Sequence, residues 1–438
     1  MTVRQHMRHL LRIGIILITL IACSAPTPSS GTPPPTADAG ARAKAVLVLW
    51  HAWPYPESRA LATIVERYNR SSPSVQIVLQ AHPVASLTSD LDIAVSEGGG
   101  PHMAILKSHT IGGPAEDGRL LSLDGLLTKA ELDQLLPAAL GSAQIALPTS
   151  SVRYGVPLTF DTLALYYNQA NFATAPPTDT TALLAVARGL TDTRSSPPIW
   201  GIALNLSLDR TIGYLYAFGG RIFDDQHSLV LGLEGRAGVE AWLNWLASLH
   251  SDERILASTD GIAVDNALMS RKALMTFDWA HALGTYHDLW NENMGVAPLP
   301  RLSDGDRDPQ PYVQSDVVVL NARIGATERQ AAVDFIRYLI GAEAQSDLLR
   351  AGRQPTLLSL DIRVVSDVNP QIRAAALVFR SQAEQGQPMP NSRQANDLVW
   401  GVLSDMQANV LRRLLAPDQA VTGADRALRE RLGQPPAP

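Results

Sequence analysis

Cysteine is almost absent from this chain, which has one Cys, Cys23, among 438 residues. One cysteine cannot form a disulfide within the chain, so a stable fold must rest on its hydrophobic core. Aromatic residues are also scarce, at 6 %, and charged residues make up 18 %. The sequence therefore excludes a small disulfide scaffold and predicts a globular protein of about two domains.

A basic surface is missing as well. The chain has 36 Lys and Arg residues against 42 Asp and Glu, a net charge of −6, and its cations are scattered rather than clustered. Proteins that bind nucleic acid carry a basic patch or stripe that neutralises phosphates. We therefore expect no nucleic-acid partner.

Long apolar runs are missing too, and the most membrane-like segment is the short run at residues 13–22. It follows three arginines and is far shorter than the roughly 20 residues that span a bilayer, which is typical of a secretory signal. We predict a signal peptide over residues 1–22. Its end, Leu20-Ile21-Ala22-Cys23, resembles the bacterial lipobox. That resemblance implies cleavage before Cys23 and lipid attachment to its sulfur; the alternative is a buried free cysteine.

The next segment, residues 23–44, consists mainly of Pro, Thr, Ser, Gly and Ala. It has too little apolar surface to offset the entropy of ordering the chain, so we predict a flexible tether.

From residue 45 onward, strand patterns alternate with helix patterns. The apolar run 45–50 and the run 75–79 predict strands, and a stripe at Leu61, Ile64, Val65 and Tyr68 predicts a helix between them, capped by Ser58. A strand, a helix and a strand of this length form a parallel βαβ unit. The same alternation continues through predicted segments at 87–95, 103–106, 155–169, 180–190, 200–204, 239–249, 271–277, 317–320, 332–339 and 398–415. We therefore predict an α/β fold with a parallel sheet.

Neither a phosphate loop nor a metal site is indicated. The triple glycine at 98–100 is not followed by Gly-Lys-Ser/Thr, so it indicates a turn. The ten His residues show no ligand spacing with Cys or Glu partners. We predict no metal, no cofactor and no catalytic residue.

Eight stretches, in matching order, together resemble one protein family. They are the segment 47–75 with Trp50-His51-Ala52-Trp53, Gly99-Gly100-Pro101, 155–172, Phe218-Gly219-Gly220-Arg221-Ile222-Phe223, 271–279, 296–300, 332–345, and Pro388-Met389-Pro390-Asn391 ahead of Trp400. They resemble the extracellular solute-binding proteins of ABC importers, in the sugar-binding group that includes maltose-binding protein. The resemblance spans about residues 46–430.

The resemblance implies a two-lobed periplasmic-binding-protein-like α/β fold, with a hinge of three crossovers and a central ligand cleft. Lobe 1 would comprise 46–159 and 300–358, and lobe 2 would comprise 163–297 and 360–435. The stretch 155–169 would be the first crossover, and the others would lie near 297–302 and 357–361. The resemblance further implies that the two lobes close around the ligand by a hinge motion.

Ligands of parallel sheets sit beyond the carboxyl ends of the strands, and a sugar needs aromatic faces and polar side chains. Trp53 lies in a loop that we expect to be exposed. Trp279 and Trp400 match ligand-facing positions of the family, with buried packing as the alternative for each. Trp50, Trp242 and Trp245 are predicted to be core, as is at least one of Tyr166 and Tyr167.

The polar candidates are Glu57, His109, Asp161, Asp209 and Asp278. Asp161 matches a family carboxylate that contacts sugar hydroxyls, or else it caps the amides of Leu163 or Ala164. Asp209 could instead form a surface ion pair with Arg210. Two departures from the maltose-type pattern, Asp278 before Trp279 and Lys107 in place of an aromatic, leave the sugar open.

The resulting hypothesis is a lipid-anchored receptor that delivers a sugar or oligosaccharide to the permease subunits of an ABC importer. We expect a monomer, held through Cys23 in the periplasm or on the outer face of the cytoplasmic membrane. Two alternatives remain at this point. One is an exported glycoside-acting enzyme using two carboxylates among Glu57, Asp161, Asp209 and Asp278, and the other is a receptor for a non-sugar ligand.

Overall fold

The computed structural model describes residues 44–147, 150–224, 228–303 and 307–435. The predicted signal peptide, Cys23 and all but the last residue of the predicted tether lie outside these ranges. In the part of the chain that the structure describes, no helix is long and apolar enough to cross a membrane.

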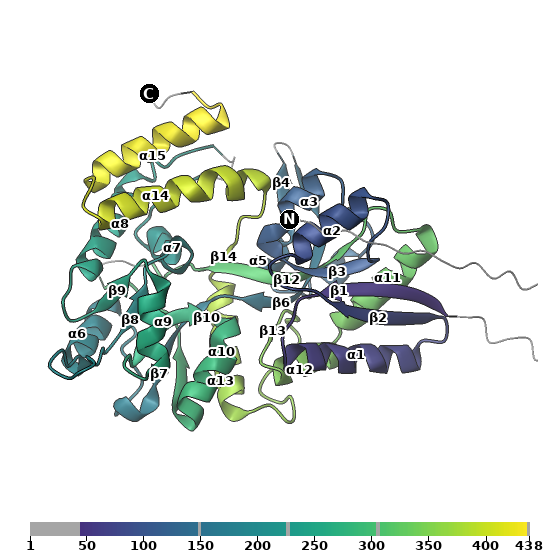
Figure 1. Ribbon diagram of the computed structural model, residues 1–438, viewed down its shortest axis with the longest axis horizontal. Helices are drawn as coiled ribbons and strands as arrows, with labels where there is room; N and C mark the ends of the chain where they lie inside the picture. The colour runs from purple at the N-terminus through teal and green to yellow at the C-terminus, as the bar shows by residue number, and fades with distance from the viewer. Residues whose placement is uncertain (1–43, 148–149, 225–227, 304–306, 436–438) are drawn as a thin grey trace, which may run out of the picture. The chain divides into compact units, whose positions relative to one another are not determined.

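The first sheet contains seven strands, six of them in the order β13-β6-β12-β3-β1-β2, with β14 paired to β12 (Figure 1). Their bounds are β1 Ala45–His51, β2 Val75–Ala81, β3 Met103–Lys107, β6 Gly155–Asp161, β12 Tyr312–Leu320, β13 Gln354–Pro355 and β14 Gln387–Pro388. The predicted parallel unit is confirmed, because β1 pairs in parallel with both β2 and β3. The prediction of an all-parallel sheet was wrong, because β12 arrives from the other half of the chain and runs antiparallel to β3 and β6.

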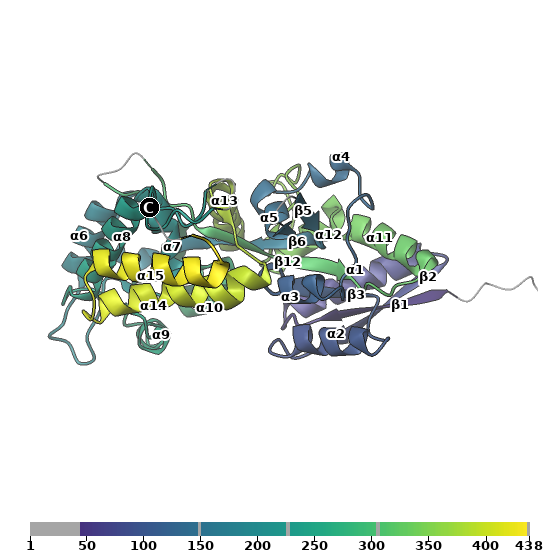
Figure 2. The same cartoon turned by 90° about the horizontal axis from the view of Figure 1, so that it is seen from above.

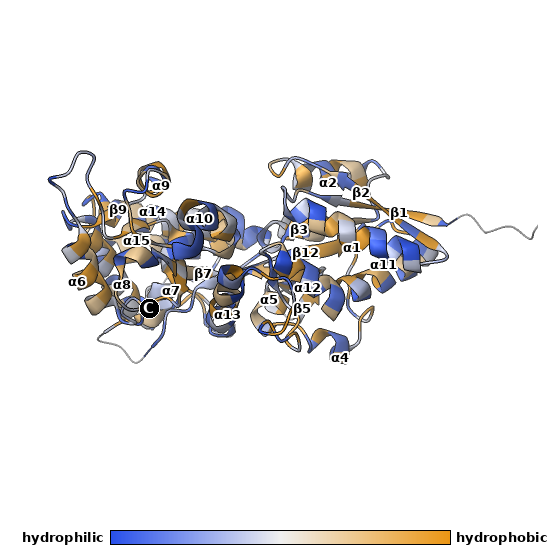
Figure 3. Cartoon of the chain, turned by 90° about the horizontal axis from the view of Figure 1, so that it is seen from below, coloured by the Kyte–Doolittle hydropathy of each residue, from blue (hydrophilic) through white to orange (hydrophobic). Residues whose placement is uncertain are grey.

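Apolar side chains alternate between the two faces of this sheet, which is why both faces are covered by helices. In β12, Val318 and Leu320 join one core cluster, whereas Val317 and Val319 join the other. Strand β1 is hydrophobic over most of its length (Figure 3). The helices of this half are α1 Glu57–Ser71, α2 Leu87–Ser96, α3 Gly112–Glu116, α4 Lys129–Leu132, α5 Pro137–Ser142, α11 Ala326–Leu339 and α12 Ala342–Arg350, with the 3₁₀ turn η1 Ser108–Thr110 and the hairpin β4 Gln144–Leu147 and β5 Ser150–Arg153.

Helix α1 has the predicted buried stripe of Leu61, Ile64 and Val65. It begins one residue before the expected cap, at Glu57, and Pro56 occupies the cap position without a side-chain hydrogen bond. Glu57 in the first turn and Arg70 in the last turn both complement the helix dipole.

The second half is built on the antiparallel sheet β10-β7-β11 and the small parallel pair of β8 with β9. The strands are β7 Leu163–Asn168, β8 Ala203–Asn205, β9 Leu256–Ser258, β10 Met275–Trp279 and β11 Met294–Ala297. The helices are α6 Thr180–Leu190, α7 Leu208–Ala217, α8 Arg236–His250, α9 Gly261–Met269, α10 Leu283–Trp290, α13 Pro370–Glu384, α14 Trp400–Leu411 and α15 Pro417–Leu432, with short turns η2 Gln169–Asn171, η3 Ala280–Ala282 and η4 Asn291–Asn293. The predicted core positions Trp242 and Tyr166 are fully buried here, while Trp245 is only partly buried.

The stretch 155–169, predicted as the first crossover, consists of two strands that belong to different sheets. β6 pairs in the first sheet and β7 in the second, and Thr162 lies between them. The hydroxyl of Thr162 donates to the carbonyl of Tyr312 at 3.0 Å, which fixes this crossing against β12. The chain crosses again between β11 and β12, and a third time between β13 and α13.

A further segment, residues 387–396, returns to the first half before α14, and we call it the strap. Its β14 pairs with β12, the Asn391 amide donates to the carbonyl of Ser142 at 2.6 Å, and Arg393 pairs with Asp117 at 2.7 Å. This return was not predicted from the sequence pattern.

The predicted last helix, 398–415, is shorter than expected. It follows a π-helical turn, η5 Ala395–Val399, ends at Leu411 and is followed by α15. α14 and α15 lie side by side in both views (Figure 1, Figure 2). Both contribute to the core of the second half, for example through Leu403 and Leu428.

Candidate binding site at the carboxyl edge of the first sheet

Polar side chains gather where several strands of the first sheet meet at one edge. Strands β1, β3 and β6 end there, and the antiparallel β12 begins there. Asp316 stands in register with Lys107 at the end of β3, and Gln314 with Asp161 at the end of β6. This is the edge at which open α/β sheets hold their ligands.

Asp161 is 5 % exposed and accepts three hydrogen bonds. The backbone N–H of His281 donates at 3.1 Å, His281 Nδ1 lies 2.6 Å from the other oxygen, and Gln314 Nε2 donates to that oxygen at 3.2 Å. Burial raises the pKa of Asp161, but the charge and hydrogen bonds of His281 and the charge of Lys107 together outweigh burial and lower the pKa to about 2. In turn the charge of Asp161 raises the pKa of His281. Among the described residues, the backbone N–H that donates to the Asp161 carboxylate belongs to His281. From the sequence, Leu163 or Ala164 was the candidate for this role.

Asp316, also buried, lies between two cations. Lys107 Nζ lies 2.9 Å from one carboxylate oxygen, and Arg353 Nη1 lies 2.7 Å from the other. The hydroxyl of Thr159 donates to the second oxygen at 3.1 Å. Burial raises the pKa of Asp316, but Lys107 and Arg353 together lower it by more than burial raises it. The pKa of Asp316 therefore lies below its usual value. The carboxylate is therefore charged at neutral pH and fully paired.

Trp53 is buried, with 7 % of its surface exposed, so the expectation of an exposed Trp was wrong. A loop position does not determine where a side chain points, and this indole gains by packing into the core of the first half. The Arg353 guanidinium lies 4.9 Å from its ring centroid, a cation–π distance. Glu57 lies on the other side of Arg353, with Oε1 3.6 Å from Nε. The two predicted residues thus meet through Arg353.

His109 belongs to the same edge. Burial lowers its pKa, Lys107 lowers it further, and Gln314 and Asp316 raise it. Its carbonyl accepts a hydrogen bond from the strap residue Asn396 at 2.6 Å. His109 is therefore a neutral side chain at physiological pH, next to the charged network.

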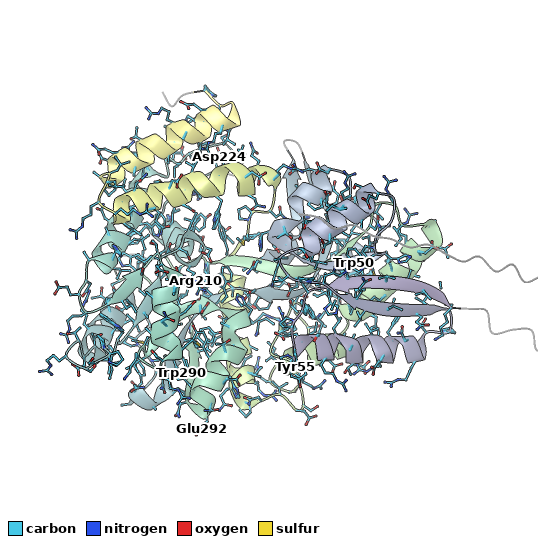
Figure 4. The ribbon with its side chains drawn as sticks, in the orientation of Figure 1. Trp50, Tyr55, Arg210, Asp224, Trp290 and Glu292 are labelled. Carbon is cyan, nitrogen blue, oxygen red and sulfur yellow. The ribbon has the colours of Figure 1, made fainter. Side chains whose placement is uncertain are left out.

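Asp209, Asp278 and Trp279 form a second cluster, around β10 and the first turn of α7. Asp278 accepts bonds from Arg210, from the backbone N–H of Trp279 at 2.7 Å, and from the hydroxyl of Tyr286 at 2.7 Å. Trp279, which is 4 % exposed, donates its indole N–H to Asp209 at 3.1 Å. Asp278 is thus committed to internal partners, among them Arg210 from the first turn of α7 (Figure 4).

His281 connects the two clusters, since Asp161, Lys107 and Asp278 all act on its pKa.

Trp400 lies apart from both clusters, on the first turn of α14 after the π-helical turn η5. It is partly buried against the core of the second half, with its ring 6.2 Å from that of Tyr312. A π-helical turn often marks a functional site.

Four members of the charged network were not predicted: His281, Gln314, Asp316 and Arg353. His281 and Arg353 come from segments that are far from Asp161 along the chain. Gln314 and Asp316 lie in the first part of β12, which the sequence pattern placed outside the strand. The only feature of the sequence that could have indicated Gln314 and Asp316 is their place just before an apolar run. Polar residues in that place are common in loops, so the feature does not distinguish a strand from a loop.

Within the described residues, no group of three His, Cys, Asp or Glu side chains is arranged to hold a metal ion. The site consists of ionised carboxylates, guanidinium and ammonium groups, amides and partly buried rings. Such groups bind hydroxyl-rich or polar ligands by hydrogen bonds and ring contacts.

The alternation of two α/β halves around crossing strands defines a two-lobed binding-protein fold. The chain belongs to the family of bacterial extracellular solute-binding proteins, whose family model matches residues 63–369. This family consists of binding proteins and not of enzymes, so the enzyme alternative is not supported.

The chain is similar to a maltotriose-binding protein of Pyrococcus abyssi, with 24 % identity over 362 residues, covering 81 % of this chain and 75 % of that protein. Its fold matches the maltose/maltodextrin-binding domain from Bdellovibrio bacteriovorus bound to maltotriose, with a TM-score of 0.70 at 21 % identity, covering 89 % of this chain and 100 % of that one. It also matches a cyclic α-maltosyl-1,6-maltose-binding protein from Arthrobacter globiformis, with a TM-score of 0.75 at 18 % identity, covering 89 % and 99 %. The mixed α/β periplasmic-binding-protein fold is thereby established.

Proposed function

We propose that this chain is a lipid-anchored extracytoplasmic receptor that captures a sugar or oligosaccharide and delivers it to the permease subunits of an ABC importer. The solute is held between lobe 1, residues 46–159 and 300–358, and lobe 2, residues 163–297 and 360–435. The family supports a solute-binding role. Relatives and structural neighbours named for maltotriose or maltodextrin binding support the choice of an oligosaccharide.

The observation that carries the proposal is the polar network at the carboxyl edge of the first sheet. Asp161, Lys107, Asp316 and Arg353 lie at the edge where such sheets hold ligands, and Asp316 forms ion pairs with both Lys107 and Arg353. Charge-assisted hydrogen bonds from groups of this kind are about twice as strong as neutral ones. A sugar hydroxyl both donates and accepts, so it can join such a network without bringing a charge of its own.

We infer that eight side chains contribute to ligand binding: Trp53, Glu57, His109, Asp161, Asp209, Asp278, Trp279 and Trp400. Four of them, Trp53, Asp161, Asp278 and Trp279, are largely buried and already have partners. These four therefore support the site from beneath, by fixing Arg353, His281, Arg210 and Asp209 in place. The remaining four, Glu57, His109, Asp209 and Trp400, offer groups to the ligand.

Attachment to the membrane would come through lipid on Cys23, which lies outside the described residues. The lipobox-like end of the predicted signal peptide and the predicted tether after it support this arrangement. The receptor would act as a monomer, in the periplasm or on the outer face of the cytoplasmic membrane.

Isothermal titration calorimetry tests the choice of ligand. We expect binding of maltose, maltotriose or maltotetraose in the micromolar range, which corresponds to about 8 kcal/mol. The panel includes glucose, unrelated oligosaccharides, an amino acid and a polyamine. Heat from a polyamine or an amino acid, with none from any sugar, would overturn the sugar assignment while leaving the family assignment intact.

A further inference from the structure

His281 is the most exposed side chain of the charged network at the carboxyl edge of the first sheet. Its side chain is 49 % exposed, whereas Lys107 is 30 % exposed and Asp161, Asp316 and Arg353 lie largely buried. The imidazole comes from the turn η3, directly after β10, and reaches across to the end of β6. A ligand that approaches this edge therefore meets the imidazole of His281 before it meets the carboxylate of Asp161.

The two nitrogens of this imidazole have different surroundings. Nδ1 lies 2.6 Å from one oxygen of Asp161, and the backbone N–H of the same histidine donates to the other oxygen at 3.1 Å. An ionised carboxylate only accepts hydrogen bonds, so the proton between them belongs to Nδ1 and fixes the orientation of the ring. Nε2 has no hydrogen-bond partner in the described part of the chain, and the residue itself is exposed. Nε2 is therefore available to a ligand while Nδ1 holds the ring in place.

Charged groups on three strands act on this imidazole. Asp161 at the end of β6 raises its pKa most, Asp278 on β10 raises it as well, and Lys107 at the end of β3 lowers it, as burial does. Gln314 on β12 bonds the same carboxylate but carries no charge. Because the pKa is raised, the ring keeps its second proton to a higher pH than a free imidazole does. Below that pKa Nε2 is a hydrogen-bond donor, and above it Nε2 is an acceptor.

We propose that His281 is the residue of this pair that touches the sugar: Nε2–H donates a hydrogen bond to one of its hydroxyl oxygens, and Asp161 beneath acts as the positioning residue that orients the ring. This inference rests on the proposed function and deepens it, because it names the contact group and the protonation state in which that group binds. Asp161 alone would present only acceptors to the ligand, whereas the protonated imidazole presents a donor. Since this donor exists only on the protonated ring, binding of the sugar is coupled to the protonation of His281.

Isothermal titration calorimetry over a range of pH tests this coupling, with two buffers of different ionisation enthalpy at each pH. Maltotriose is the probe, or the panel sugar that binds most tightly where maltotriose does not bind. In the wild-type protein we expect the affinity to fall as pH rises above 6.5 through the folded-state pKa of His281, because the donor is lost. Near that pKa the measured heat should differ between the two buffers, because the protein takes up protons as it binds. A role of His281 in folding alone would produce no such difference.

Two substitutions of the histidine measure the strength of the contact. His281→Ala removes the donor, and below pH 6.5 we expect about ten- to hundredfold weaker binding, the range for a hydrogen bond from a charged group. His281→Gln retains an amide donor that does not titrate, so we expect a smaller loss and an affinity that changes little with pH. Neither variant should take up protons on binding. Circular dichroism shows whether each variant is folded.

Asp161→Asn tests the positioning role. It removes the charge that raises the pKa of His281 most, so the fall in affinity should move to lower pH. An unchanged pH profile would overturn the positioning role. His287→Gln is the matched control, because His287 on α10 is also partly exposed, at 31 %, and lies near the carboxylate of Asp288, but it is outside the network. This control should show wild-type affinity and wild-type proton uptake.

The results that overturn this inference differ from those that overturn the proposed function. Wild-type binding without proton uptake, or unchanged affinity in His281→Ala, would remove the contact while leaving the proposed function in place. Proton uptake that persists in His281→Ala would assign the coupling to another group and overturn the inference. Wild-type protein that binds none of the sugars in the panel would overturn the proposed function and this inference with it.

Discussion

At the scale of single residues, the pair of Asp161 and His281 determines how the site responds to pH. The pKa of His281 is raised above its ordinary 6.5, so its contribution to stability is fully present below pH 6.5 and is lost as pH rises through the folded-state pKa. The pKa of Asp161 is lowered from 3.8 to about 2, so its contribution is present above pH 3.8 and is lost as pH falls through about 2. The ion pair therefore exists from mildly acid to neutral pH.

This pair gives the first prediction. In an NMR titration, the imidazole of His281 should titrate above pH 6.5 in the wild-type protein. In Asp161→Asn its pKa should fall, because the largest cause of the upward shift is removed while burial still lowers it. The free energy of unfolding should decline as pH rises above 6.5 in the wild type and decline less in the variant.

His281→Gln is the control for that stability curve, since it also removes the titrating group. A wild-type His281 that titrates at or below pH 6.5 would contradict the assignment. So would an unchanged pKa in Asp161→Asn.

The same pair shows what sequence could and could not provide at this scale. Asp161 could be proposed because it follows a Gly-Val-Pro segment and precedes an alternating apolar run, in a stretch that resembles the family. His281 could not be assigned to it, because 120 residues separate them and only the pairing of β10 with β7, which sets Trp279 opposite Leu163, brings them within 2.6 Å. Likewise, the sequence indicated that Trp53 follows the first strand, but it did not indicate the direction in which the side chain points.

At the scale of elements, the strap, residues 387–396, packs closely against α3. Gly112 in α3 is what allows this close approach. A Cβ built at Gly112 would lie 2.1 Å from the carbonyl oxygen of Asn391, a backbone atom that cannot move aside alone. The neighbouring Gly113 has ample space, with its nearest neighbour, Arg393 Nη2, at 3.5 Å.

We predict that Gly112→Ala destabilises the protein by about 1–3 kcal/mol, as overpacking does elsewhere. Gly113→Ala, the matched control one residue away, should change stability by less than about 0.5 kcal/mol. Urea unfolding followed by circular dichroism measures both. Equal stability of the two variants would show that the strap can move away from α3 at no cost.

Periodicity identified the elements that have one apolar stripe and sharp ends, such as α1 and α6. It failed where an element depends on a distant partner. β12 was found only in its apolar second half, since its first residues are polar and are paired by strands from elsewhere in the chain. The stretch 155–169 was predicted as a crossover, but its division into two strands could not be found from periodicity, because both halves are buried and the break at Thr162 arises from the change of sheet.

At the scale of the whole molecule, the proposal joins a membrane anchor, a tether and a two-lobed receptor. Replacing Cys23 with Ser should remove the site of lipid attachment while leaving the receptor domain unchanged. We predict that the wild-type protein incorporates radiolabelled palmitate in bacterial cells and sediments with membranes. Cys23→Ser should incorporate none and appear in the soluble extracytoplasmic fraction, with wild-type affinity for its sugar. Equal labelling of both proteins would contradict the lipid anchor.

The central claim is that an oligosaccharide binds at the carboxyl edge of the first sheet, between the two lobes. A crystal structure of the protein grown with maltotriose or maltotetraose tests it most directly. We predict sugar density within hydrogen-bonding distance of the group formed by Asp161, Lys107 and Asp316, with groups of the second lobe on its other side. A well-ordered sugar bound elsewhere on the surface, or an edge that stays free of sugar at saturating concentration, would contradict the account.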